Sequence, residues 1–366
     1  MANSEQSDII NLRSPSAVAA TVPYLLGFLP SWSLVLLLSQ SDAKAPRGRV
    51  VLTIRFDLPD SAGGLVALES EVARRAQHVA ADSAIAVIYA DPGEQPPPTR
   101  WRLLVARLGV GLAVVGVHLS DALFVADGQW WSYLCVDQDC CPAEGNSVAD
   151  AAGCAAAAEA VWHGMALAGS REELALSFAQ VSPERVLETV AVLGEVEPTV
   201  RANFSQWRDV AEAEFIALIA SAESEPVIRL APPVTAGTLL ALADFRVRDP
   251  IMWFLANQAT LPELRAAQQV LLDLVAAAPR DLLPPAATLL AIVCWQLGNG
   301  TQAHLALARI ARAVPEYALA TLVGRALDAG MPPSEWVQMM RGLDIAGCRT
   351  GVSSRPRQVA QAPPAA

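Results

Sequence analysis

Strand and helix signals are divided unevenly along the 366 residues, and this division most constrains the fold. Before about Ser147, apolar runs of strand length alternate with amphipathic segments, which predicts an α/β domain with a mixed sheet. After Ser147, strand signals nearly vanish and helix starts recur, so an all-α region is expected. We therefore predict an α/β domain over 1–146, a helical segment and connector over 147–235, a helical repeat-like domain over 236–347 and a disordered tail over 348–366.

The first helix has clear end signals. Ser14 and Pro15 are typical of a helix start and Gly27 of a helix end, so a helix over 15–26 is expected. The patterns that follow predict a strand over 33–38, an antiparallel partner over 50–57, a helix over 65–80, a strand over 83–90, a helix over 100–108 and a strand over 111–119. Alternating strands and helices predict parallel pairing with right-handed crossovers.

The sheet is expected to end in a β-hairpin. Asp127-Gly128 stands between two apolar runs, which is the strongest short signal for a two-residue turn. Because side chains alternate across a strand, Trp130 and Trp131 are expected to face opposite sides of the sheet. We expect one to be buried and the other to be partly exposed beside the cysteines that follow.

The C-terminal half carries helix-start signals and one repeat-like stretch. Thr260 and Glu263 form a capping box, and Asp249-Pro250 is interpreted as a further helix start. The stretch from Pro284 to Pro315 has the spacing of helix, glycine turn, helix and proline stop, and it resembles half of a tetratricopeptide repeat. An ordinary α-bundle explains the same pattern equally well.

Charge and composition exclude several kinds of chemistry. The net charge of −11 disfavours broad contact with nucleic acid, and Lys44 is the only lysine, which excludes most lysine-based catalysis. The uncharged stretches 14–41 and 282–308 are interrupted by prolines, so soluble helices and strands are expected there, not membrane spans. The acidic N-terminus is unlike a signal peptide, which favours a cytoplasmic protein with free thiols. We expect no cofactor, no nucleic-acid partner and no membrane association, and oligomeric state stays open.

The densest group of chemically distinctive side chains is a thiol turn made of Trp130, Trp131, Cys135, Cys140 and Cys141. It allows three interpretations. The first is a zinc site completed by Cys154 or His163, the second is a redox pair, and the third is a purely structural turn. Adjacent cysteines chelate awkwardly, so the structural turn is favoured. We expect no stoichiometric metal, together with a close, reduced Cys135–Cys140 pair.

Polar residues near predicted strand ends form a second candidate site. Ligands of open α/β sheets bind beyond the carboxyl ends of the strands, although aspartate after a strand is also ordinary turn chemistry. Arg248-Asp249 is a further candidate, able to form an ion pair or reach a ligand carboxylate. The candidate ligand residues are Arg55, Asp57, Tyr89, Asp91, Asp121, Arg248 and Asp249.

Several sequence blocks together resemble one known family. The blocks are Leu12-Arg-Ser-Pro15, Val22-Pro-Tyr-Leu-Leu-Gly-Phe28, the Asp127-Gly-x-Trp-Trp-Ser132 hairpin, Cys135-x4-Cys140-Cys141-Pro142-x-Glu-Gly145 and Val247-Arg-Asp249. Their order and spacing resemble an actinobacterial domain-of-unknown-function family, family 4192, from about Leu12 to Trp336. The resemblance implies a bacterial cytoplasmic protein. It implies no activity and no catalytic residues.

Two functions follow as hypotheses from these observations. The first is a non-enzymatic binding or adaptor protein that uses its helical C-terminal region to hold a protein partner. The alternative is a small-molecule hydrolase or nucleotide-binding enzyme with its site at the strand ends. The sequence lacks the usual phosphate-loop, zinc-protease and nucleophile-elbow motifs, which favours the first.

Overall fold

The computed structural model describes residues 12–41, 49–90, 99–162, 165–179, 181–202, 204–223, 225 and 228–350. The chain divides into two compact units. The first comprises Met1–Phe178, Gly298–Gln302 and Arg325–Pro332, and the second comprises Ala179–Leu297, Ala303–Gly324 and Pro333–Ala366. In the described part of the chain, no helix combines the length and apolar character that crossing a bilayer requires.

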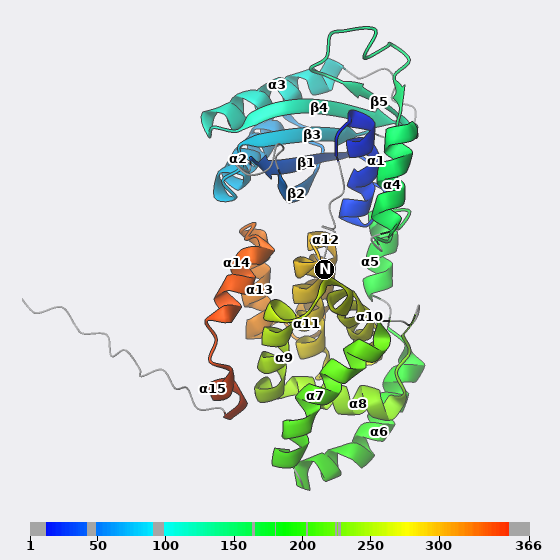
Figure 1. Ribbon diagram of the computed structural model, residues 1–366, viewed down its shortest axis with the longest axis vertical. Coiled ribbons are helices and arrows are strands. Elements are labelled where there is room, and N and C mark those ends of the chain that lie inside the picture. The colour runs from blue at the N-terminus through cyan, green and yellow to red at the C-terminus, as the bar shows by residue number, and fades with distance from the viewer. Residues whose placement is uncertain are drawn as a thin grey trace, which may run out of the picture. The chain divides into compact units, whose positions relative to one another are not determined.

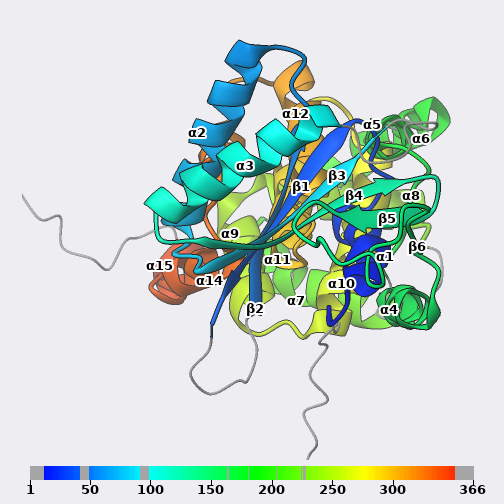
Figure 2. The same ribbon diagram turned by 90° about the horizontal axis from the view of Figure 1, so that it is seen from above.

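A six-stranded mixed sheet forms the centre of the first unit, with strand order β2-β1-β3-β4-β5-β6 (Figures 1 and 2). The strands are β1 Ser33–Gln40, β2 Arg49–Asp57, β3 Ser83–Tyr89, β4 His118–Ala126, β5 Gln129–Ser132 and β6 Asn146–Ser147. Strand β1 is antiparallel to both β2 and β3, while β3 and β4 are parallel. The expected mixed sheet, the antiparallel first pair and the hairpin of β4 and β5 are present, but the sheet does not end with this hairpin, because β6 pairs with β5.

The predicted strand over 111–119 is wrong. Helix α3 runs through Thr99–Val114, and the strand that pairs with β3 begins only at His118. Leu108 and Leu112 of α3 are buried in the core, so apolar burial continues the helix across Gly109 and Gly111. As a result, β4 is both the parallel partner of β3 and the first arm of the hairpin.

Helices cover the sheet on both sides. Helices α2 (Ala62–His78) and α3 lie side by side across one face and share its core (Figure 2). On the other side α1 (Pro15–Leu26) packs with α4 (Ala151–Trp162). Trp130 and Trp131 are therefore both buried, at 6% and 4% exposed. The expectation that one of them is exposed is wrong, because neither face of the sheet is open to solvent there.

The second unit is helical. Its helices are α6 Pro183–Ala202, α7 Phe204–Ala222, α8 Pro232–Ala243, α9 Phe245–Asn257, α10 Leu261–Ala277, α11 Leu283–Gln296, α12 Gly300–Ala313, α13 Ala318–Asp328, α14 Pro333–Arg341 and α15 Ile345–Thr350. Parts of α12 and α13 belong to the first unit, as does α5 (Arg171–Ala179) apart from its last residue. The capping box of Thr260 and Glu263 is formed as predicted.

Two predictions for this half need correction. Asp249-Pro250 does not start a helix, because Asp244 caps α9 through the backbone N–H of Arg246 and Pro250 lies inside the helix. The predicted disordered tail over 348–366 is wrong for residues 348–350, which belong to α15. Residues 351–366 lie outside the described part of the chain.

Candidate functional site

The cysteine loop, residues 133–145, connects β5 to β6 in the first unit. Asp127 and Gly128 make the preceding turn with φ values of 46° and 75°, the backbone geometry that aspartate-glycine turns favour. At the other end of β5, the Ser132 hydroxyl donates to Asp121 Oδ1 (2.6 Å) and accepts the backbone N–H of Cys135 (3.1 Å). The start of the loop is therefore hydrogen-bonded to a side chain of β4.

Within this loop the three cysteine side chains converge. The Sγ atoms of Cys135, Cys140 and Cys141 all lie within 4.8 Å of one another. The backbone N–H of Cys141 donates to the carbonyl of Asp137 (2.8 Å), and Asn146 Nδ2 donates to the carbonyl of Cys140 (2.9 Å). These bonds fold the segment back on itself. The predicted closeness of Cys135 and Cys140 is confirmed.

The far side of the loop packs against Trp131. The indole Nε1 donates to the carbonyl of Ala143 (3.1 Å), and Gly145 lies against the ring. Gly145 also has a φ of +82°, a conformation that other residues adopt at a cost. The glycine and the tryptophan together set the path along which the loop returns to the sheet.

The surroundings of the thiols favour their protonated form. Desolvation, with a smaller contribution from the nearby Cys135, raises the pKa of Cys141 to about 11. The pKa of Cys140 is also raised, first by its hydrogen bond with Cys135 and then by repulsion from that sulfur. At neutral pH these two groups are poor thiolate nucleophiles, which weakens the redox interpretation.

The loop offers three sulfur ligands, and Cys154, one of the two possible fourth ligands, is not among them. Cys154 lies on α4, where its thiol contacts the carbonyl of Ala149 (3.4 Å), and it is not part of the cluster. His163 lies outside the described residues. Chemically, the cluster can hold a cation that prefers sulfur, or two of its thiols can form a disulfide if oxidised.

At the strand ends, two of the candidates, Arg55 and Asp57, contact each other. The Arg55 guanidinium is bound to Asp57 (2.6 Å) and donates to the hydroxyl of Ser33 (2.9 Å), and Ser33 lies between β2 and β3 in the sheet register. Tyr89 is buried and its hydroxyl donates to the carbonyl of Ala19 (3.1 Å); burial raises its pKa. Arg55 and Asp57 thus form an ion pair, and Tyr89 is a core residue.

The remaining strand-end candidates do not complete this site. Asp121 lies inside β4 and not after a strand, so its assignment to a strand end is wrong; its register partner in β3 is Ile85, while Tyr89 pairs with Val125. At about 3.3 Å per residue, four residues along a strand separate these levels by roughly 13 Å. Asp91 lies outside the described residues.

Arg248 and Asp249 belong to the second unit. Arg248 binds Asp249 through Nε and Nη2 (2.8 and 2.6 Å) and donates to the Tyr317 hydroxyl through Nη1 (2.6 Å). Burial raises the pKa of Tyr317. Two roles were considered for Arg248, an ion pair with Asp249 and binding of a ligand carboxylate. The structure shows the ion pair.

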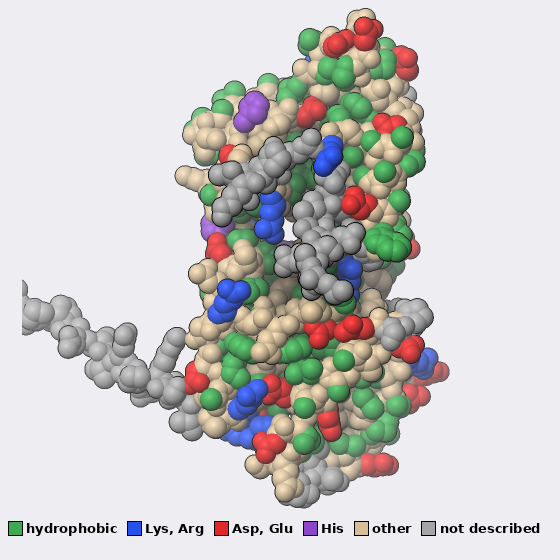
Figure 3. Space-filling view, viewed as in Figure 1, with side chains coloured by type: hydrophobic (Ala, Val, Ile, Leu, Met, Phe, Trp, Pro, Cys, Tyr) green, Lys and Arg blue, Asp and Glu red, His purple; other side chains and the backbone are tan. Residues whose placement is uncertain are grey.

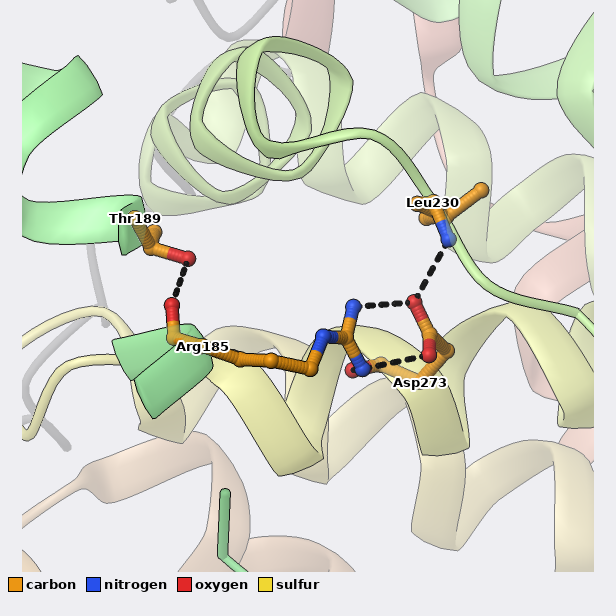
Figure 4. A network of polar contacts seen from close by, with 4 residues as sticks. All are labelled: Arg185, Thr189, Leu230 and Asp273. Atoms are coloured by element: carbon orange, nitrogen blue, oxygen red, sulfur yellow. Dashed lines mark hydrogen bonds and ion pairs between the residues drawn. The ribbon is translucent and has the colours of Figure 1, made fainter. Parts of the chain in front are cut away.

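Sequence reasoning missed an unusual surface on α6. This helix turns polar residues inward: Arg185 forms a two-bond ion pair with Asp273 (2.5 and 2.7 Å), and Thr189 is buried (Figure 4). Its outward face carries large apolar side chains instead, with Leu187 70% and Val190 50% exposed. Hydrophobic and acidic side chains are interspersed on the surface where Figure 1 labels α6 and α8 (Figure 3).

Comparison with known protein families shows to which family the chain belongs. The model of a family described as a domain of unknown function, DUF4192, matches residues 15–334, nearly the whole chain. The chain belongs to this family. The DUF4192 match covers both units, so the cysteine loop and the α6 surface both lie inside the family domain. No curated protein and no solved structure matches the chain.

Proposed function

We propose that this protein is a non-enzymatic binding protein that holds a protein partner on its helical C-terminal unit. The observation that carries the proposal is the outward apolar face of α6. Residues three, four and seven apart lie on the same face of a helix, so one side of α6 carries Leu187, Val190, Ala191 and Gly194. Exposed apolar surface of this kind is typical of interaction sites.

The charges around this strip define the kind of partner. Glu184, Glu188 and Glu195 are exposed and lie along the edge of the apolar strip. A partner helix with an apolar stripe and basic flanks would complement both features, with the small side chains at Ala191 and Gly194 allowing close approach. The chain's net charge of −11 adds a general attraction for such a segment.

The proposal also covers the repeat-like arrangement of the helices and the cellular origin of the protein. We propose a tetratricopeptide-like arrangement around α11 and α12; Gly298 has a φ of +81° between these two helices, the turn that such a repeat requires. We also propose an actinobacterial cytoplasmic protein, supported by its single lysine and by six cysteines that form no disulfide in the described part of the chain. The enzymatic alternative at the strand ends stays a prediction.

The test compares three full-length proteins as immobilised baits in an actinobacterial extract. They are the wild type, Leu187→Asp/Val190→Asp, and Leu322→Asp, which introduces a charge at a 60% exposed leucine on α13. Support requires a protein retained by the wild type and by Leu322→Asp but lost from the double variant. Equal retention by all three, with unchanged circular dichroism, would contradict the proposal.

A direct probe sharpens the result. A synthetic amphipathic helix of leucine and lysine should bind the wild type, and its affinity should fall with added salt. Glu184→Arg/Glu188→Arg should weaken binding of this peptide, since the variant reverses the flanking charges. Undiminished affinity in that variant would contradict the charge argument.

A further inference from the structure

Three thiols in one surface loop form a group that the proposed partner-binding function does not use. They come from the turn that begins just after β5 and from the Cys140-Cys141 pair five residues later, and the fold brings them together. Two hydrogen bonds, from the Cys141 N–H to the Asp137 carbonyl and from the Asn146 side chain to the Cys140 carbonyl, hold this shape together with the packing of Trp131. The sulfurs are therefore already grouped before any ligand binds.

We propose that Cys135, Cys140 and Cys141 bind one soft, closed-shell cation, zinc(II) or copper(I), through their three sulfur atoms. Bonds of about 2.3 Å from zinc to each sulfur set the sulfurs about 3.8 Å apart in a tetrahedral site. The separations in the loop, all within 4.8 Å, require only small side-chain movements to reach this geometry.

The electrostatics of the loop agree with a cation. Three thiolates whose sulfur atoms lie within 4.8 Å of one another repel one another. A bound cation removes the repulsion, and each thiol releases its proton to solvent when the sulfur–metal bond forms. Thiolate sulfur selects copper(I) and zinc over the hard cations calcium and magnesium, which prefer oxygen.

The number of ligands separates the two metals. Copper(I) is satisfied by three sulfurs, whereas zinc takes four ligands and would complete its shell with water or a donor from another molecule. The exposure of Cys140 leaves room for this fourth ligand. This inference revises the expectation of a metal-free turn, which rested on the awkwardness of adjacent cysteines. The arrangement of the loop lets both Cys140 and Cys141 reach the third sulfur.

The experiment loads the full-length, fully reduced, untagged protein under anaerobic conditions with zinc sulfate or with copper(I) and removes the excess. Metal per chain is measured by mass spectrometry, and cobalt(II) loading adds a charge-transfer absorption that reports sulfur ligands. About one zinc or copper per chain is expected in the wild type. The matched control is Cys154→Ser, an exposed cysteine outside the cluster, which should keep the metal.

Cys140→Ser and Cys135→Ser should each lose stoichiometric metal and the cobalt absorption. Thermal unfolding of the metal-free proteins shows whether each variant still folds; because Cys140 is exposed, that variant should match the metal-free wild type. A wild type that retains no more zinc or copper than Cys140→Ser would overturn the proposal. Loss of the metal on Cys154→Ser would overturn it equally.

Discussion

Gly145 lies so close to Trp131 that a β-carbon added to the glycine would stand 2.5 Å from Cε2 of the indole. The contact joins the end of the cysteine loop to a side chain buried in the sheet. A neighbour this rigid cannot move aside as a flexible chain end would. The position therefore requires glycine for two reasons, its positive φ and the absence of space.

Gly145→Ala should lower the free energy of unfolding by about 3 kcal/mol, because overpacking and left-handed backbone strain add together. Gly128→Ala is the matched control: its φ of +75° is similar, but nothing lies within 4 Å of the added carbon. It should cost only about 1 kcal/mol. Urea unfolding of both variants measures the difference, and equal losses would show that the indole contact is unimportant.

Arg185→Met should destabilise the protein by about 3 kcal/mol, because it leaves the carboxylate of Asp273 buried with the backbone N–H of Leu230 as its one remaining donor among the described residues. Arg349→Met breaks another two-bond ion pair, with Glu212, but that arginine is 56% exposed. The control should cost less than about 1 kcal/mol. Denaturant unfolding compares them, and similar costs would argue against the importance of burial.

Tyr89→Phe should cost about 1–2 kcal/mol, since it removes the donor to the buried carbonyl of Ala19. The change leaves the ring in place, so no cavity contributes. Thermal and urea unfolding give the value. A variant as stable as the wild type would indicate that this hydroxyl does not support the fold and would reopen its candidacy as a ligand group.

Stability should fall above pH 9 because of Cys294. Burial raises the pKa of this thiol from 9.0 to about 12. Between those values the unfolded chain releases a proton that the folded chain keeps, so the stabilisation is complete below pH 9 and is lost as pH rises toward 12. Raising the pH from about 8 to about 10 should lower the free energy of unfolding of the wild type by about 1 kcal/mol more than that of Cys294→Ala. Parallel curves would contradict this assignment.

Asp121→Asn should loosen the cysteine loop without unfolding the sheet. Its carboxylate accepts from the Ser132 hydroxyl, which in turn accepts the backbone N–H of Cys135. Outer partners of this kind change metal affinity by about 10-fold when they are altered. Competition with a coloured chelator measures zinc affinity, and an unchanged value would show that the hydrogen-bond chain does not position Cys135.

Local signals predicted the parts of the fold that depend on neighbouring residues. Asp127-Gly128 specifies its turn by backbone preference, and Thr260 caps its helix through a residue three positions later. The strand over 111–119 failed because the glycines flanking Val110 suggested a break, while burial of Leu108 and Leu112 decided for helix. Tertiary packing outweighed local preference there.

The candidate sites, like the strand over 111–119, depend on tertiary contacts that local sequence signals do not specify. The cysteines were recognisable as a group, but their convergence depends on hydrogen bonds with the Asp137 carbonyl and the Asn146 side chain that no spacing rule specifies. The outward face of α6 was missed because leucine is expected to point inward. Arg185 faces inward only because Asp273, 88 residues later, neutralises it.

Strand β1 obtains both of its neighbours from later parts of the chain. Its segment Leu34–Leu38 is wholly apolar and is 0–2% exposed once the sheet is complete. During synthesis it emerges from the ribosome before both partner strands, and it stays without the second of them until Tyr89 has followed. For that interval the nascent chain presents a short, uncharged β-segment of the kind that aggregates, so chaperone supply should govern its yield in a foreign host.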